Sequence, residues 1–398
     1  MRTMHTVLKR GGLVWVRDAV PAALFPPRVA RVQEAIAAAG HDAWLVYGDA
    51  YSYGDLAYLT HFLPRVRGAV VLVPREGAPA LLVAVGSRDI PAAKTLTWVD
   101  DVRPFTRLPG EVDKLIREQG LERARIGLVN VEEQLAVGDW AQIRALLPDV
   151  DWQSADGTLA ALRADKDATE LAVMRHTATL VGEGLAAAAE ALRAGVSERA
   201  VLAAVDRRLR YGAVEDARVL IASGPRASIS LRPTDDRVLE AGDVVLLHLA
   251  AEYQRYWAEA GQTFVLGAAD EATRRLADSA ERALSAMSGA LRPGAPAGAA
   301  ADAALEVLNA ADASLSTQHS ALSTSYGLGH GIGLDLEEAP YLRLGATAPL
   351  VEGAVLALHV VLHGERGRGA LATRTVVVEA GGARPLVDDR APLVGLPG

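Results

Sequence analysis

The chain has 398 residues, 50% of them hydrophobic and 23% charged, which is enough for two domains that each bury a core. Its formal net charge is −8, and no dense basic run with interleaved aromatics occurs, which argues against nucleic acid as a partner. The absence of cysteine excludes disulfides, thiolate metal sites and cysteine nucleophiles. Charges interrupt the apolar residues of the N-terminus, and no uncharged apolar run reaches the length of a membrane span. We therefore expect a cytoplasmic protein without a membrane partner.

The first part of the chain alternates helical and strand patterns. Residues 28–40 have the periodicity of an amphipathic helix that ends on glycine, and PGEVDKLIREQG has a similar pattern. Apolar runs of strand length occur at 43–48 and in GAVVLVP, ALLVAVG and RIGLVN. This alternation predicts an α/β N-terminal domain over residues 1–160 with a largely covered sheet.

A second domain is expected over residues 161–398. Helical patterns at 169–195 and 197–211 precede the strand RVLIASG and the paired strands DVVLLHLAAEY and RYWAEAGQTFVLG. Two alanine-rich helices follow at about 269–312. A glycine-rich turn and two strands around VLALHVVLH and ALATRTVVVE complete the chain. The pattern predicts an α+β domain.

Several motifs carry a family resemblance. The turn from Gly327 to Pro340 contains GHGIG and EEAP, and the preceding segments include SGP, PTD and GDVVL in that order. The N-terminal half contains YGDAYSYGDLAYLTHFLPR and GSRDIPAAKTLTWVDDV. Together these segments resemble the creatinase, prolidase and aminopeptidase P family over nearly the whole chain. The resemblance implies a pita-bread fold for the second domain, with a curved antiparallel sheet, and a homodimer.

Peptidases of that family hold two metal ions with Asp, Asp, His, Glu and Glu. The resemblance places these ligands, in order, at His248, Glu259, His330, His359 and Thr373. Only His330 keeps the family's residue type. The family's two proton-handling histidines are also replaced, one of them in the loop near residues 230–231 and the other by Glu337.

These replacements predict the loss of two-ion chemistry. Thr373 is neutral and cannot bridge two cations, and Glu259 is the single formal negative charge among the five positions. Without the two histidines, no group is evident that would stabilise a tetrahedral oxyanion or protonate a leaving amine. We therefore expect no cleavage of Xaa-Pro peptides.

Four of the five positions nevertheless hold residues able to bind metal. We predict one divalent ion, with Glu259, His330 and His359 as a facial set and His248 as fourth ligand or as acid/base. Two histidines and a carboxylate with open positions are typical of non-haem Fe(II) sites, so Fe(II) is favoured. Zn, Mn, Ni and Cu also suit the set.

Three arginines are candidates for binding a substrate carboxylate. Arg65 follows the N-terminal motif, Arg232 lies in the loop that carries a catalytic histidine in the family, and Arg374 follows Thr373. Surface charge is the alternative for each. We select His248, Glu337 and Arg232 as catalytic candidates.

The sequence thus predicts a non-peptidase metalloenzyme that acts on a small amino-acid-like molecule, by oxygenase, hydrolase or lyase chemistry, in a biosynthetic pathway. Two alternatives stay open. One is a metal-free C–N hydrolase of the creatinase kind, and the other is an inactive binding protein of the same fold. Metal analysis would separate the first hypothesis from the other two.

Overall fold

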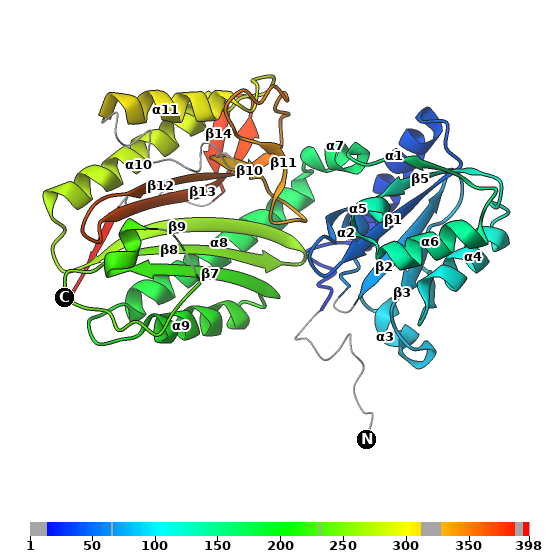
Figure 1. Cartoon of the computed structure of the whole chain (residues 1–398), viewed down its shortest axis with the longest axis horizontal. Coiled ribbons are helices and arrows are strands. Elements are labelled where there is room, and N and C mark those ends of the chain that lie inside the picture. The colour runs from blue at the N-terminus through cyan, green and yellow to red at the C-terminus, as the bar shows by residue number, and fades with distance from the viewer. Residues whose placement is uncertain are drawn as a thin grey trace. The chain divides into compact units, whose positions relative to one another are not determined.

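The computed structural model describes residues 14–64, 67–229, 231, 233–311, 328–386 and 393–397. The chain divides into two units, Met1–Arg163 and Ala164–Gly398 (Figure 1). None of the helices in the described part of the chain is long and apolar enough to cross a membrane.

The N-terminal unit is built on a six-stranded sheet of order β4-β3-β2-β1-β5-β6. The strands are β1 (Ala43–Asp49), β2 (Gly68–Pro74), β3 (Ala80–Val83), β4 (Asp101–Pro104), β5 (Arg125–Val129) and β6 (Asp151–Ser154). β2 is antiparallel to both neighbours, and the other neighbouring pairs are parallel. The central strands are buried on both faces, which explains their continuous apolar sequence.

Helices cover both faces of this sheet. They are α1 (Phe25–Ala38), α2 (Gly54–Thr60), α3 (Ile90–Lys94), α4 (Leu108–Glu118), α5 (Val131–Gln134), α6 (Val137–Leu146) and α7 (Thr158–Ala164). Alternate residues of β1 pack with α4 and α6 in one apolar cluster. The other face of β1 meets α2, where Gly48 leaves room for Leu56.

The C-terminal unit contains a nine-stranded sheet whose main order is β11-β10-β12-β13-β9-β8-β7. Its strands are β7 (Asp216–Ser223), β8 (Val244–Tyr253), β9 (Tyr256–Leu266), β10 (Gly329–Gly331), β11 (Glu338–Tyr341), β12 (Val355–His363), β13 (Gly369–Glu379), β14 (Gly382–Pro385) and β15 (Leu393–Leu396). β14 pairs with β13, and β15 pairs in parallel with β9. The main path is antiparallel throughout.

The four α-helices that the structure describes in this unit pack on one face of the sheet. They are α8 (Ala168–Ala191), α9 (Glu198–Tyr211), α10 (Glu271–Ala290) and α11 (Ala299–Ala311). Asp167 and Glu170 form a capping box at the start of α8. α10 and α11 bury the even-numbered residues of β12 and β13, such as Leu358 and Val376. α8 packs on β8 and β9, where Gly184 admits Leu249. The odd-numbered residues of β12 and β13 therefore point to the face without helices.

The predicted fold class is confirmed, because the first unit is α/β and the second has the curled sheet and helix pairs of a pita-bread domain. The predicted helix at 169–195 is α8, which ends four residues earlier, at Ala191.

Candidate metal centre

The expected ligand positions converge on the helix-free face of the C-terminal sheet. His248 lies on β8, Glu259 on β9, His330 on β10, His359 on β12 and Thr373 on β13. The register explains which of them are neighbours. His359 lies opposite Thr373, Thr373 lies opposite Gly261, and Gly261 lies opposite His248.

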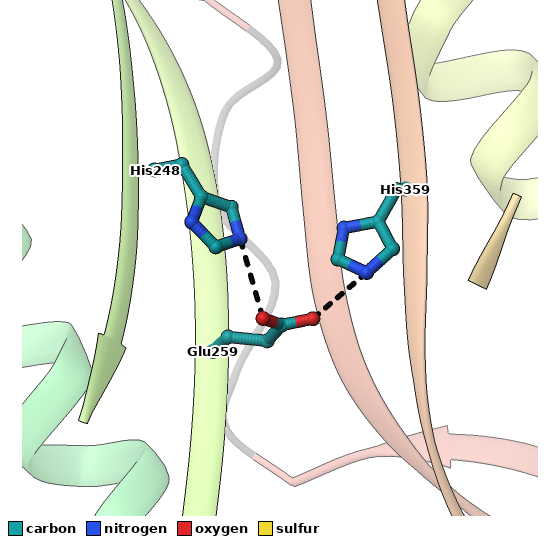
Figure 2. A group of neighbouring side chains, drawn as sticks. All are labelled: His248, Glu259 and His359. Atoms are coloured by element: carbon teal, nitrogen blue, oxygen red, sulfur yellow. Dashed lines mark ion pairs between the residues drawn. The ribbon is translucent and has the colours of Figure 1, made fainter. Parts of the chain in front are cut away.

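Curvature of the sheet brings the outer residues together. β8 and β12 are three strand spacings apart, which is about 14 Å in a flat sheet. Yet the ring centroids of His248 and His359 are 5.8 Å apart, and those of His330 and His359 are 5.1 Å apart. In Figure 2 the two imidazoles of His248 and His359 approach from opposite sides, with the carboxylate of Glu259 between them. The face that carries the cluster is therefore concave.

The distances between ligand atoms are short throughout the cluster. His359 Nε2 lies 2.8 Å from Glu259 Oε1, and His248 Nε2 lies 3.3 Å from Glu259 Oε2. His330 Nε2 lies 3.1 Å from His359 Nε2 and 3.7 Å from Glu259 Oε1. His248, Glu259 and His359 form a group whose ligand atoms all lie within 4.8 Å of one another. We expected Glu259, His330 and His359 as a facial set with His248 as fourth ligand. The ligand atoms of the first three lie 2.8, 3.1 and 3.7 Å from one another, and His248 approaches the same carboxylate from β8 at 3.3 Å.

The hydrogen bonds around the cluster leave ligand atoms free. His330 Nδ1 lies 2.9 Å from the carbonyl oxygen of Gly331, which makes Nδ1 the donor and directs the lone pair of Nε2 into the cluster. Glu259 Oε1 is buried and, within the described part of the chain, accepts no hydrogen bond of acceptable geometry, although His359 is close. His248 Nδ1 is likewise buried without a described partner.

The shifted pKa values of the cluster indicate that it retains a proton when no cation is bound. Burial opposes ionisation of Glu259, but the charges of His359 and His248 outweigh burial and hold the pKa of Glu259 well below its usual range. Burial also lowers the pKa of His359, but the charge of Glu259 outweighs it and raises that pKa above the ordinary value. Burial and the neighbouring His359 lower the pKa of His330. A divalent cation would displace the proton that the raised pKa of His359 retains on that ring.

The donor set fits a divalent cation. Ligands at 2.0–2.2 Å from a tetrahedral ion are separated by about 3.3–3.6 Å. The measured separations of 2.8, 3.1, 3.3 and 3.7 Å surround that range. Two imidazole nitrogens that face each other at 3.1 Å, beside a carboxylate oxygen without a hydrogen-bond donor, are the arrangement expected around an ion. Thr373 adds no charge, so the residues fit one ion and not a bridged pair.

Two residues that the sequence analysis did not single out, Thr375 and Gly261, contact the residues at the ligand positions. Thr375 accepts a hydrogen bond from the Glu259 backbone N–H at 3.0 Å and donates to its carbonyl oxygen at 2.7 Å. Gly261 leaves room for Thr373, because a Cβ there would lie 2.8 Å from Thr373 Oγ1. Thr373 Oγ1 in turn lies 3.4 Å from His359 Nδ1. Thr375 could have been predicted to lie on the same face as Thr373, because the two are two residues apart on one strand.

The turn between β10 and β11 places a carboxylate near the cluster. Glu337 is exposed, and its charge acts to raise the pKa of both His330 and His359. The next residue, Glu338, is buried and pairs with Lys166 at 3.1 Å. Glu338 also accepts a hydrogen bond from the Asp335 backbone N–H at 3.0 Å. Its contacts with Lys166 and Asp335 therefore fix the turn that contains Glu337.

Of the three candidate arginines, the structure describes only Arg374, which lies away from the cluster. Arg374 lies on the helix-covered face of β13, where it donates to Glu281 of α10 at 2.9 Å, because adjacent strand residues point to opposite faces. Arg65 and Arg232 lie outside the described residues. His363, at the end of β12, contacts the carbonyl oxygen of Ala227 at 3.2 Å and not the cluster.

Comparison with known families follows the same division of the chain. Residues 172–380, more than half of the chain, match the family model of metallopeptidase family M24. Residues 28–164 match the creatinase/prolidase N-terminal domain. The chain belongs to metallopeptidase family M24. The resemblance to the creatinase, prolidase and aminopeptidase P family is thereby confirmed.

Individual relatives of this M24 protein carry peptidase names. A probable dipeptidase PepE from Mycobacterium tuberculosis is 27% identical over 374 residues, which cover 91% of this chain and 94% of the relative. An Xaa-Pro dipeptidase from Pyrococcus furiosus is 26% identical over 238 residues, which cover 59% of this chain and 66% of the relative. The solved X-Pro aminopeptidase from Thermotoga maritima shares the fold, with a TM-score of 0.82 at 20% identity, and the match covers 92% of this chain and 99% of that one.

These names overturn the prediction of a non-peptidase enzyme and, with it, the metal-free and inactive alternatives. That prediction assumed that loss of the two-ion ligand set removes peptide hydrolysis. The assumption was wrong on chemical grounds, because a single ion held by two histidines and a glutamate is itself a peptidase arrangement. The family supports a divalent ion, and the His/Glu cluster supplies a candidate place for it.

Proposed function

We propose that this M24 protein is a metal-dependent peptidase that hydrolyses short peptides with one divalent ion. His248, Glu259 and His359 would hold the ion, and His330 would complete the set. The observation that carries the proposal is the convergence of three ligand atoms within 4.8 Å of one another on a concave sheet face. The peptidase names of the relatives supply the reaction class.

An ion in this set would polarise a peptide carbonyl and lower the pKa of a bound water to about 7. The side chains would do the rest. Glu259 would balance the positive charge of the site, and the Gly331 carbonyl would fix the orientation of His330. Glu337, exposed near the cluster, is our candidate to accept the proton of the attacking water and to pass it to the leaving amine.

The identity of the ion belongs to the proposal as well. Two or three imidazoles and one carboxylate suit Zn(II), the usual ion of hydrolytic His₂Glu sites, and also suit Fe(II), Mn(II), Ni(II) and Cu(II). Because the proposed reaction is hydrolysis, no change of oxidation state is needed. We propose a homodimer on the basis of the family resemblance, which light scattering would test. Arg232 stays a proposed contact for the substrate carboxylate, and the cytoplasmic location stays a prediction.

The decisive experiment is a peptidase assay of tag-free protein reconstituted separately with each ion. Dipeptides with and without proline as the second residue would be supplied, and the released amino acids would be quantified by mass spectrometry. We expect hydrolysis that requires the ion and that His359→Ala abolishes. His363→Ala is the matched control, since His363 lies on the same strand and contacts Ala227 instead of the cluster. Failure to cleave any dipeptide with any of the ions would refute the proposal.

A further inference from the structure

A cavity of about 570 Å³ lies within the N-terminal unit, far larger than a packing defect and within the usual range of small-molecule sites. It is lined by Tyr47 near the end of β1, by the segment between β4 and α4, and by the start of α6. The metal cluster does not contribute to it, so the proposed peptidase reaction leaves it unexplained.

The cavity occupies the edge of the sheet where such folds bind ligands. β1, β3, β4, β5 and β6 all run in one direction, since β2 is antiparallel to both β1 and β3. Phe105 follows the last residue of β4, and Arg67 precedes the first residue of the antiparallel β2. Both therefore lie at the carboxyl edge of the parallel strands, which is the usual ligand edge of α/β sheets.

Two exposed arginines line the cavity at this edge. Arg67 has a φ of 56°, uncommon for a residue with a side chain, and its Nη1 donates to the carbonyl oxygen of Thr106 at 3.0 Å. That bond holds the Arg67 guanidinium beside the residue that precedes Arg107. Arg107 is the N-cap of the eleven-residue α4, whose first turn adds positive potential. Within the described part of the chain, neither arginine forms an ion pair, so an anion would relieve a concentration of positive charge.

A tyrosine hydroxyl also lines the cavity. Tyr47 is only 8% exposed, and its ring lies over Gly68, where a Cβ would be 2.5 Å from the phenol oxygen. No described residue hydrogen-bonds to this hydroxyl, so it is available to a molecule in the cavity. Burial, with the charges of Asp49 and Asp139, raises the pKa of Tyr47, so the hydroxyl stays protonated and able to donate.

The cavity also contains a negative charge and apolar walls. Asp139 of α6 lines it, and its carboxylate has no partner among the described residues. Phe105 and Leu135 are buried apolar residues of the same lining. A phosphate dianion would be repelled by Asp139, whereas a molecule with both a carboxylate and an ammonium group would satisfy both signs of charge.

We propose that this cavity binds a free α-amino acid with an apolar side chain. Arg67 and Arg107 would hold the carboxylate, Asp139 would attract the ammonium group, and Tyr47 would donate a hydrogen bond. The site is separate from the metal cluster, so occupancy would report the level of a peptide-derived amino acid without requiring catalysis.

Calorimetric titration of the full-length protein with L-leucine tests this proposal. We expect saturable binding of one leucine per chain with a Kd of about 1 mM or tighter. L-leucinamide, which lacks the carboxylate, and 4-methylpentanoate, which lacks the ammonium group, should each bind about tenfold more weakly or worse. Arg107→Gln and Tyr47→Phe should weaken leucine binding about tenfold. Arg123→Gln should leave it unchanged, because Arg123 is 85% exposed and lies outside the cavity.

Glu259→Ala separates this site from the metal cluster. We expect leucine binding to persist in that variant, whatever happens to peptidase activity. Leucine binding that is lost in Glu259→Ala but kept in Arg107→Gln would place the amino acid at the metal cluster and overturn the proposal. So would the absence of saturable binding, or equal affinity for leucine and 4-methylpentanoate.

Discussion

Buried carboxylates occur in two different settings within the C-terminal unit. Glu215 is 2% exposed and pairs with the fully buried Arg255, whose Nη1 lies 2.8 Å from both carboxylate oxygens. Glu259 is equally buried, at 2%, but its neighbours are the imidazoles of His248, His330 and His359. Arginine carries a permanent charge, whereas each imidazole is charged only when protonated.

The difference between a permanently charged partner and titratable partners distinguishes a structural ion pair from a binding site. The Glu215–Arg255 pair is electrically complete without any added group, so its expected contribution is to the stability of the fold. The Glu259 cluster is complete only with a proton or a cation at its centre, and its nitrogen lone pairs suit a metal ion. Changes in the first should therefore affect stability, and changes in the second should affect metal binding and activity.

The largest effect is expected for Glu259→Gln. The amide removes the one negative charge of the ligand set, so metal affinity and kcat/KM for dipeptides should each fall by at least about 100-fold. Calorimetric metal titration and steady-state kinetics measure the two quantities. Unchanged hydrolysis in the Glu259→Gln variant would show that this cluster does not take part in catalysis.

Glu215→Gln should act on stability instead. Removing the charge of Glu215 from its pair with the buried Arg255 should lower the free energy of unfolding by about 3–5 kcal/mol while metal stoichiometry is retained. Glu271→Gln is the matched control, because the Glu271–Arg275 pair is exposed (82% and 69%) and should contribute less than about 0.5 kcal/mol. Urea unfolding followed by circular dichroism measures both. Equal effects in the two variants would contradict the assigned role of the buried pair.

The pH dependence should distinguish the metal-bound from the metal-free cluster. The raised pKa of His359 stabilises the metal-free fold at low pH. This stabilisation is lost as the pH rises through the pKa of His359 in the folded protein. The lowered pKa of Glu259 stabilises the metal-free fold at pH values above the pKa of Glu259 in the unfolded chain. This stabilisation is lost as the pH falls through the pKa of Glu259 in the folded protein. The metal-free cluster is thus most favourable between about pH 4.5 and 6.5.

A cation competes with the proton on His359, so the rise in Tm on adding metal should grow as pH increases from about 5.5 to 8. Thermal scans with and without the ion at several pH values measure this. A metal-induced rise that is constant over that interval would show that the ion binds elsewhere.

The smallest effect is expected for Thr373→Val. The Thr373 hydroxyl is 3.4 Å from His359 Nδ1, at the long limit of a hydrogen bond, so its loss should lower metal affinity by about tenfold or less. Metal titration of the variant measures the change. Complete loss of the ion would show that Thr373 is itself a ligand and would contradict the proposed set of His248, Glu259, His330 and His359.

The family resemblance named His248 and Glu259 as ligand positions, and the residues alone could not have done so. The structure places the two on the hairpin β8–β9, where their side chains lie on one face at 3.3 Å. Arg374 shows the limit of reasoning from proximity in sequence. It follows Thr373, and for that reason it points to the opposite face of β13.

Two features lay beyond the sequence. The curvature that brings His248 within reach of His359 depends on packing over the whole sheet, so the sequence could not give the distance between the two rings. The reaction class could not be read from lost ligands either, because Glu259 with two histidines suits hydrolysis as well as oxidation.

The most direct test of a one-ion site is the metal content of the tag-free wild-type protein. After reconstitution with excess ion and removal of the unbound fraction, mass spectrometry of the metal and amino-acid analysis of the chain give the stoichiometry. We predict one ion per chain, absent from His359→Ala and retained in His363→Ala. Two ions per chain, or none with any of Zn, Fe, Mn, Ni and Cu, would contradict the one-ion account.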